Sequence, residues 1–241
     1  MSVDIEEVYK NTWIHYQEAK KQMNLSESRD LSHYDAISDR IPGFHADKLE
    51  FGSYDKANFA VLFVDMRRST QRAQEVGAKK TFLTMHVYLT ALLEVVKHYK
   101  GKVIDIMGDG IMAFWGGEVA REKDNMTKYH AVQNAGLCGR DMLTVRQKVI
   151  NKIIEEEQLG PIIHFGVGVT FDSVVVTKIG IQGSYDVKAF GDCINIAAKY
   201  ASVENKVRVS KKVKNEWPSG ANGKIKFTPD IGGESYILTS T

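Results

Sequence analysis

The chain has 241 residues, of which 43% are hydrophobic and 26% are charged, and its formal net charge at pH 7 is +2. These values are typical of a soluble globular protein, and the near balance of charge argues against a nucleic-acid-binding surface. No apolar run is long enough to span a bilayer, the polar start does not resemble a signal peptide, and two cysteines without metal-ligand spacing suit a reducing compartment. We therefore expect a cytoplasmic protein with no nucleic-acid or membrane partner.

The first 50 residues differ in pattern from the rest of the chain. Apolar residues recur among charged ones at a spacing that fits an amphipathic helix: Ile5, Val8, Trp13 and Tyr16. A polar connector follows, with Pro42 and Gly43 near its end. We expect residues 1–50 to form an N-terminal helical extension and residues 51–241 to form the main domain.

Sharper patterns begin near residue 58. The near-continuous apolar run "NFAVLFVDM" (58–66) predicts a strand buried on both faces. Residues 81–101 follow a long helical pattern that ends in basic residues and a glycine, which is a common stop signal. In "KVIDIMGDGIMAFW" (102–115), two apolar segments flank Gly-Asp-Gly, which predicts a β-hairpin.

The second half of the chain continues the alternation of helices and strands. A helical region is expected over 124–157, and residues 162–180 are expected to give two strands joined through Phe171-Asp172. A helix (191–202) and three short strands (206–210, 224–229 and 234–238) follow. This βαββαβ order with a C-terminal addition predicts a ferredoxin-like α/β (α+β) fold, with helices packed on one face of a mostly antiparallel sheet.

Two aspartates are expected at one end of this sheet. Asp65 ends the first buried strand, and Asp109 lies in the turn of the hairpin beside it. Either residue alone is more often a cap or turn residue than a ligand. Two neighbouring carboxylates repel, however, unless a cation lies between them, and oxygen ligands suit Mg²⁺ or Mn²⁺. Since Mg²⁺ favours a few carboxylates plus substrate phosphates, the pair predicts a two-metal site for a nucleoside triphosphate.

The segment that follows Asp65 fits such a substrate. Arg67 and Arg68 supply guanidinium groups, while Ser69 and Thr70 supply hydroxyls and backbone amides at the start of a helix. These groups predict a cradle for a polyphosphate. Met66 offers its backbone carbonyl as a further metal ligand.

Four stretches resemble, in order and spacing, the class III nucleotide cyclase catalytic domain. They are "FVDMRRST", "DIMGDGIMAFWG", "FGVGVTFDSVVVTKIG" and "FGDCINIAAK", and the resemblance covers about residues 57–240. It implies that Asp65 and Asp109 hold two metal ions while a ribose 3′-oxygen attacks the α-phosphate, giving a 3′,5′-cyclic nucleotide and pyrophosphate.

The resemblance also assigns a transition-state Asn and, one helical turn later, an Arg. The matching residues here are Asn195 and Lys199, which share one helical face at i, i+4 spacing. Lysine keeps the charge of arginine but lacks its bidentate fork, so we expect Arg67 or Arg68 to compensate.

The base-reading positions depart from both purine patterns of the family. Adenylate cyclases carry Lys and Asp there and guanylate cyclases tend to carry Glu and Cys, whereas this chain has Asp105 and Lys188. Asp105 can accept from N3–H of uracil while Lys188 donates to a carbonyl, and cytosine or adenine can be read by the same groups. Pocket size would have to exclude a purine, for which Phe51 and Tyr54 are candidates. The alternative for Lys188 is a solvated lysine in contact with Asp186.

Taken together, the chain is similar to the bacterial antiphage pyrimidine cyclases. This similarity implies conversion of UTP to cyclic UMP, with cytidylate cyclase, adenylate cyclase and an inactive nucleotide-binding module as alternatives. It also implies a head-to-tail homodimer with two shared sites, because the metal aspartates come from one chain and the base readers and Asn195 helix from the other. A separate effector that senses the cyclic nucleotide is implied as well.

Overall fold

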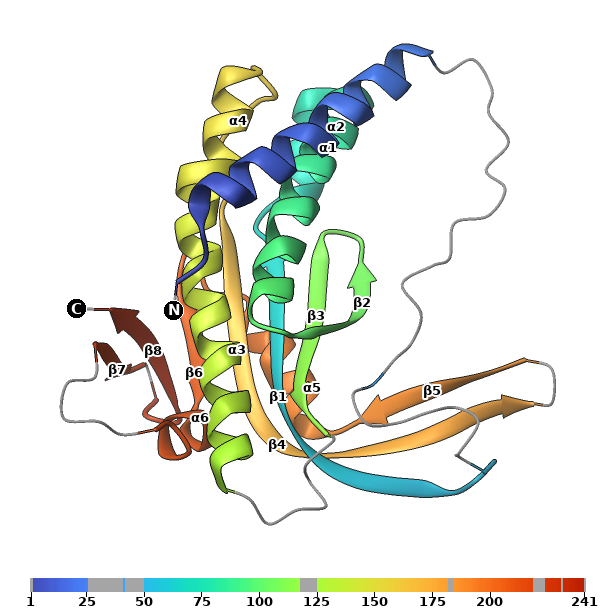
Figure 1. The fold of residues 1–241 in the computed structure, drawn as a ribbon, viewed down its shortest axis with the longest axis vertical. Helices are drawn as coiled ribbons and strands as arrows, with labels where there is room; N and C mark the ends of the chain where they lie inside the picture. Colours follow the sequence, from blue (N-terminus) through green and yellow to red (C-terminus); the bar gives the residue numbers. More distant parts are fainter. Residues whose placement is uncertain are drawn as a thin grey trace.

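A mostly antiparallel sheet forms the centre of the computed structural model, which describes residues 2–25, 41, 50–117, 125–181, 184–218, 224–230 and 232–240 (Figure 1). The helical elements are α1 (Ile5–Leu25), α2 (Ser69–His98), α3 (Asn125–Val145), the π-helical turn η2 (Arg146–Ile150), α4 (Asn151–Glu156), α5 (Asp192–Tyr200) and α6 (Lys211–Asn215). The strands are β1 (Tyr54–Met66), β2 (Lys102–Met107), β3 (Gly110–Gly116), β4 (Phe165–Ile181), β5 (Ser184–Phe190), β6 (Val207–Ser210), β7 (Ile225–Pro229) and β8 (Ser235–Ser240).

The order of the strands in the sheet is β2-β3-β1-β4-β6-β8-β7, and β5 pairs with β4 outside this path. Among the described strands, β4 and β6 form the one parallel pair, and the other pairs are antiparallel. The succession β1-α2-β2-β3-α3-β4 is the expected βαββαβ core, so the predicted fold class is confirmed.

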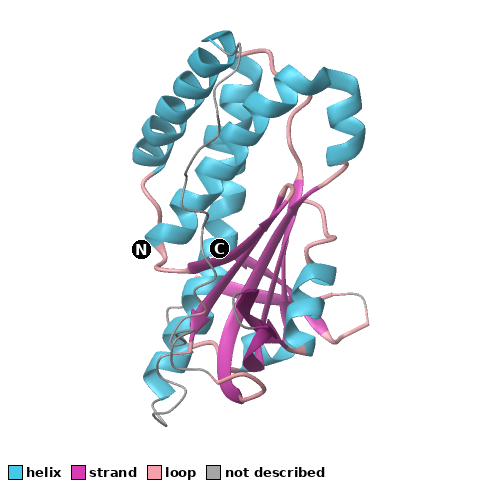
Figure 2. Ribbon diagram, turned by 90° about the vertical axis from the view of Figure 1, so that its right-hand side faces the viewer, coloured by secondary structure: helices cyan, strands magenta, loops and turns pink. Residues whose placement is uncertain are grey.

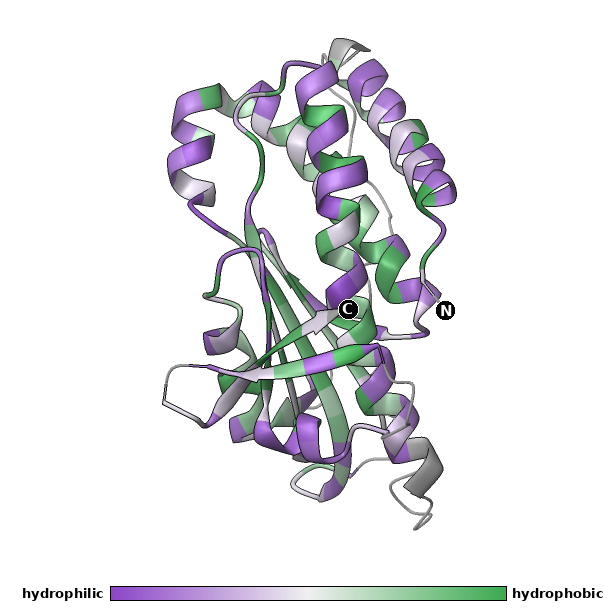
Figure 3. Cartoon of the chain, turned by 90° about the vertical axis from the view of Figure 1, so that its left-hand side faces the viewer, coloured by the Kyte–Doolittle hydropathy of each residue, from purple (hydrophilic) through white to green (hydrophobic). Residues whose placement is uncertain are grey.

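Strand β1 is buried on both faces, as its continuous apolar run predicts. Leu62 and Val64 belong to the larger core cluster, which also contains residues of α1, α2 and α3. Phe59 and Val61 point to the other face, where they pack with Cys193 and Ala197 of α5 and with other residues. Helices therefore cover both faces of the sheet rather than one: the long helices gather against one side (Figure 2), and hydrophobic residues run along the central strands (Figure 3).

Strand β4 is a single strand of 17 residues, and the expected break at Phe171-Asp172 is wrong. Both residues continue the ladder with β1, where Phe171 pairs with Ala60 and Asp172 with Phe59. The Asp172 carboxylate forms an ion pair with Lys212 of α6, so a polar residue is accommodated within the strand. The far end of β4, with β5 and the start of β1, extends away from the helices as an arm (Figure 1).

Helix α1 packs against α2, and its Val8 and Tyr16 join the larger core cluster. The Tyr16 hydroxyl and the Lys20 ammonium both contact the Glu157 carboxylate, at 2.5 and 2.7 Å. The polar connector is expected over residues 24–48, but its first two residues, Asn24 and Leu25, belong to the end of α1. Apart from Ile41, the rest of it lies outside the described residues, so the domain division at residue 50 stays a prediction. None of the described helices is both long and apolar enough to cross a bilayer.

Candidate active site

Asp65 and Asp109 lie at the same end of the sheet. Asp65 is the penultimate residue of β1 and pairs with Gly166 of β4. Its neighbour Val64 pairs with Ile111 of β3, while Asp109 lies with Gly108 in the two-residue turn closed by the Met107–Gly110 pair. Gly108 has a φ of 63°, which glycine adopts without strain and which lets the hairpin turn this tightly. The turn thus holds the Asp109 carboxylate next to the end of β1.

The two carboxylates lie within electrostatic reach of each other. Burial raises the pKa of Asp65, the negative charge of Asp109 raises it further, and Arg67 opposes both effects. The guanidinium Nη1 of Arg67 is 3.8 Å from Asp65 Oδ2, so it neutralises the carboxylate only in part. Asp109 Oδ2 is buried and has no hydrogen-bond partner among the described residues.

A divalent cation fits this donor set. An unpaired buried carboxylate oxygen beside a second, repelled carboxylate is the arrangement that bound Mg²⁺ or Mn²⁺ would stabilise. No cluster of three or more His, Cys, Asp or Glu side chains suited to a metal occurs in the described parts of the chain. Asp65 and Asp109 therefore leave further positions around a cation to backbone, water or substrate oxygens.

A pocket of about 330 Å³ opens beside Asp109. Met66, Ser69 and Thr70 line it together with Gly108 and Asp109, so the turn of the hairpin and the start of α2 face the same space. Arg68, which precedes α2, is exposed and adopts a left-handed conformation with a φ of 57°. The structure thus brings Asp109 together with the hydroxyl-bearing segment that the sequence predicts to hold a polyphosphate.

Asn195 and Lys199 lie on α5 and are exposed. Neither side chain forms a hydrogen bond or ion pair with any described residue. Cys193 and Ala197, two residues before each, are buried against the sheet. Since two residues correspond to about 200° of helical rotation, Asn195 and Lys199 project away from the sheet.

Asp105 and Lys188 lie on β2 and β5, respectively. Asp105 is exposed and follows a bulge in the β2–β3 ladder. Lys188 Nζ lies 2.5 Å from Asp186 Oδ2, so the alternative in which Asp186 holds Lys188 describes the structure as it stands. Ile104 and Ala189, the neighbours of Asp105 and Lys188, both pack against the core cluster on the α5 side of the sheet.

Tyr54 is 68% exposed at the first residue of β1. A strand rises about 3.3 Å per residue, so the eleven residues to Asp65 place Tyr54 up to about 36 Å from that carboxylate in the same chain. Phe51 precedes Tyr54 by three residues, and Lys178 Nζ lies over its ring at 4.7 Å from the centroid. Within one chain, Tyr54 and Asp65 therefore lie at opposite ends of β1.

Two buried residues near the carboxylates carry no recognisable sequence signal. Arg72 donates to the carbonyls of Leu159 and Pro161 and to the Thr84 hydroxyl, fixing the first turn of α2 beside the pocket. Tyr88 is fully buried, and burial followed by the charges of Asp109 and Asp65 raises the pKa of its hydroxyl. An arginine near a helix start and a tyrosine on an apolar face read as ordinary helix residues, so only tertiary structure reveals them.

Comparison with known proteins agrees with this fold. Residues 51–229 match the family model "Adenylate and Guanylate cyclase catalytic domain". The solved guanylyl cyclase Cya2 superposes with a TM-score of 0.59 at 20% identity, covering 76% of this chain and 91% of that one. The adenylyl cyclase CyaB from P. aeruginosa superposes with a TM-score of 0.62 at 16% identity, covering 78% of this chain and 97% of that one. At these identities the structural likeness concerns the fold.

Curated relatives include cyclases named for pyrimidine nucleotides. A uridylate cyclase from Gulbenkiania mobilis is 27% identical over 174 residues, which span 70% of this chain and 64% of that protein. A cytidylate cyclase from Staphylococcus aureus is 24% identical over 156 residues, or 63% of this chain and 36% of that protein. The chain thus spans less than two thirds of the length of each. The family match extends over most of the chain, and the protein belongs to the adenylate and guanylate cyclase catalytic domain family.

Proposed function

We propose that the protein is a pyrimidine nucleotide cyclase that converts UTP to 3′,5′-cyclic UMP and pyrophosphate. The observation that carries the proposal is the approach of Asp65 and Asp109 at one end of a cyclase fold, with an unpaired buried oxygen on Asp109. The two named pyrimidine cyclases among the relatives support the choice of base class.

The carboxylates of Asp65 and Asp109 would hold the metal, Mg²⁺ or Mn²⁺ at two ions per site, together with the Met66 carbonyl. Such ions, when bound, lower the pKa of a ribose hydroxyl and neutralise charge on a triphosphate. Ser69 and Thr70 donate hydrogen bonds to the phosphates from the pocket wall. Arg67 adds a positive charge beside Asp65, where negative charge accumulates on the leaving pyrophosphate. Arg68 is a second candidate for this role.

Asp105 and Lys188 form the proposed base reader. Uracil presents an N3–H donor between two carbonyl acceptors, which a carboxylate and an ammonium group can satisfy together. Lys188 must then exchange its contact with Asp186 for one with the base, and that exposed ion pair is weak enough to allow it. Cytosine, with an amino group beside an acceptor nitrogen, fits the same two groups, so cytidylate cyclase is the nearest alternative.

The site is completed by a second copy of the chain. Asn195 and Lys199 are exposed on α5 and can act on a triphosphate only if it lies beside them. The chain therefore needs a surface through which α5 can pair with the metal site of a second copy. Exposed apolar side chains on the arm offer such a surface: Tyr54, Ile179, Ile181 and Phe190. A head-to-tail homodimer would place each α5 over the carboxylates of the other chain and would also bring Tyr54 within reach of a base.

The proposed setting is the bacterial cytoplasm, where the cyclic nucleotide would serve as a second messenger in antiphage defence and act on a separate effector. Lys199 in place of the family's arginine weakens transition-state stabilisation without removing its charge. We therefore expect a low but measurable turnover.

Turnover of the four ribonucleoside triphosphates by the purified protein, with Mn²⁺ or Mg²⁺, tests the proposal. Cyclic UMP should be the main product, and Asp65→Asn should abolish it while leaving the fold intact. Cyclic CMP as the main product would select the cytidylate alternative, and cyclic AMP a purine cyclase. Nucleotide binding without any cyclic product would leave an inactive regulatory module.

A further inference from the structure

Helix α5 has little of its own to stabilise it. It has nine residues, and its N-cap residue, Gly191, offers no side chain to cap the first turn. Helices this short are unstable alone and depend on tertiary contacts for their position. The contacts that hold α5 therefore decide where Asn195 and Lys199 stand.

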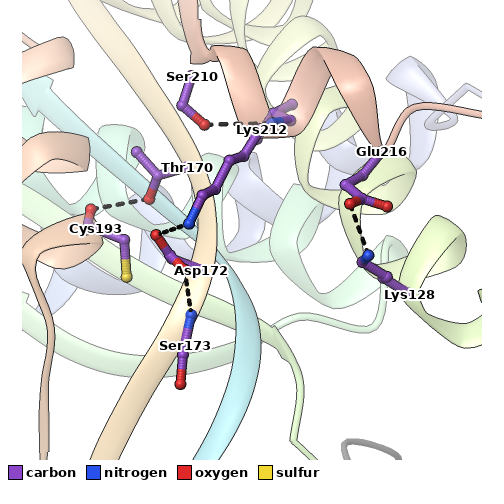
Figure 4. A network of polar contacts seen from close by, with 9 residues as sticks. Lys128, Thr170, Asp172, Ser173, Cys193, Ser210, Lys212 and Glu216 are labelled. Atoms are coloured by element: carbon purple, nitrogen blue, oxygen red, sulfur yellow. Dashed lines mark hydrogen bonds and ion pairs between the residues drawn. The ribbon is translucent and has the colours of Figure 1, made fainter. Parts of the chain in front are cut away.

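Those contacts form a regular track along β4. The Thr170 hydroxyl donates to the Cys193 carbonyl at 2.9 Å (Figure 4). A Cβ atom at Gly168 would lie 2.0 Å from the Ala197 carbonyl oxygen. At the third position, Gly166, a Cβ would lie 1.8 Å from the carbonyl oxygen of Val203 and 2.3 Å from that of Ala201.

The spacings of strand and helix agree. Residues 166, 168 and 170 alternate along β4, so they share one face and are separated by about 6.6 Å each. Carbonyls 193, 197 and 201 occur every four residues, about 6.0 Å apart along one side of the helix. The helix thus lies antiparallel to β4 with one carbonyl over each of the three positions. The two glycines permit backbone-to-backbone approach that any side chain would block.

We infer that Gly166, Gly168 and Thr170, the α5 seat, are positioning residues that set the height, rotation and axial position of Asn195 and Lys199. The glycines fix the height, because the helix rests on bare backbone. The Thr170 hydrogen bond fixes the rotation and prevents sliding, because it joins one side chain to one carbonyl. The seat lies on the side of α5 opposite the two proposed catalytic side chains, so it acts on them through the helix alone. This inference rests on the proposed function.

The first test compares Thr170→Val, which keeps the shape but removes the donor, with Thr170→Ser, which restores it. Thr239→Val is the control for the loss of a threonine hydroxyl away from α5, since the exposed Thr239 hydroxyl donates to the backbone carbonyl of Lys226 at 3.5 Å. We expect Thr170→Val to lower kcat by about tenfold or more with KM changed less than about twofold, because catalytic geometry is lost while the pocket persists. Thr170→Ser should recover most of kcat, and the control should match wild type.

The second test uses mixed dimers. Asp65→Ala and Asn195→Ala chains should each be inactive alone. Mixing them should rebuild one complete site from the carboxylates of the Asn195→Ala chain and the α5 of the Asp65→Ala chain. Thr170→Val added to the Asp65→Ala chain should abolish most of the rescued activity. The same substitution in the Asn195→Ala chain, whose α5 is already disabled, should leave the rescued activity intact. A general loss of stability would act equally from both chains.

The outcomes separate the inference from the proposed function. Rescue that is lost from one placement of Thr170→Val and kept with the other supports the α5 seat. Equal loss from both placements, or no loss from either, overturns the inference and leaves the shared-site dimer standing. Absence of any rescue between Asp65→Ala and Asn195→Ala overturns the shared site and, with it, this inference.

Discussion

The negative charge of Asp109 contributes to raising the pKa of Asp65, although the two residues come from different elements 44 positions apart in the chain. Such repulsion is a cost to the folded state that a bound cation removes. This relationship gives the first prediction.

Asp65→Asn should stabilise the protein in the absence of divalent cations while abolishing turnover. Removing one of two repelling charges should raise the free energy of unfolding by about 1 kcal/mol in chelator. In Mn²⁺ the wild type should gain stability through binding and the variant should gain much less. Thermal unfolding in both conditions measures this. Asp105→Asn, which removes an exposed carboxylate elsewhere, is the control, and equal Mn²⁺ stabilisation of Asp65→Asn and wild type would contradict the metal assignment.

Tyr88→Phe should stabilise the fold. The Tyr88 hydroxyl is buried and has no hydrogen-bond partner among the described residues, so its removal relieves a desolvation cost of about 1 kcal/mol. Tyr99→Phe is the matched comparison, because the Tyr99 hydroxyl donates to the buried Asp141 carboxylate at 2.7 Å. That variant should lose about 1.5–3 kcal/mol. Urea unfolding measures both, and a destabilised Tyr88→Phe would reveal a partner for the hydroxyl.

The contact of α1 with Glu157 should make stability depend on pH. Hydrogen bonds from Lys20 and Tyr16 lower the pKa of Glu157, so its stabilising effect is complete above the ordinary carboxyl pKa and is lost as the pH falls through the lowered value. Burial and the hydrogen bond to Glu157 raise the pKa of Tyr16 to about 12. The stability that the protonated Tyr16 hydroxyl contributes is therefore complete below the ordinary tyrosine pKa and is lost as the pH rises through the raised value.

The difference in unfolding free energy between wild type and Glu157→Gln should therefore be largest near neutral pH and shrink in acid. Denaturant unfolding across acidic and neutral pH measures the difference. The neighbouring Glu156→Gln serves as control, since Glu156 contacts Tyr9 and Lys152 in exposed positions and should contribute little at any pH. A Glu157→Gln effect that stays constant as the pH falls would refute the linkage.

Exchanging the charges of the base reader should change nucleotide preference. Asp105→Lys combined with Lys188→Asp reverses the order of the two charges to the one that the resemblance implies for adenylate cyclases. It replaces the carboxylate that is proposed to accept from N3–H with an ammonium group that cannot. The ratio of UTP to ATP turnover should fall by about tenfold or more. Each single substitution, which places two like charges at the base, should lower turnover of both nucleotides. An unchanged ratio in the double variant would remove Asp105 and Lys188 from base recognition.

Much of the fold is predictable because its signals are local. The apolar run ending at Asp65, the Asp-Gly turn at Asp109 and the basic end of α2 each follow from neighbouring residues, and their order fixes the βαββαβ core. The length of β4, in contrast, depends on a contact with a residue far along the chain. An aspartate at position 172 suggests a turn until Lys212, 40 residues later, supplies its ion pair.

The candidate site divides in the same way. The positions of Asp65, Asp109 and Asn195 follow from motifs, but the contacts around them depend on tertiary structure. Asp186 lies two residues before Lys188 and was foreseeable as its partner. The unpaired hydroxyl of Tyr88 and the hydrogen bond from Thr170 to the Cys193 carbonyl could not be foreseen. A buried tyrosine and a strand threonine give the same sequence pattern whatever their side chains contact.

The middle of β4 is enclosed on every side. Val167 pairs with Val64 of β1 at one edge and with Val207 of β6 at the other, and α3 and α5 lie on the two faces. Its amides should consequently be among the last in the molecule to exchange with deuterium. The arm at the far end of the same strand should exchange early, and protection appearing there as protein concentration rises would report chain association residue by residue.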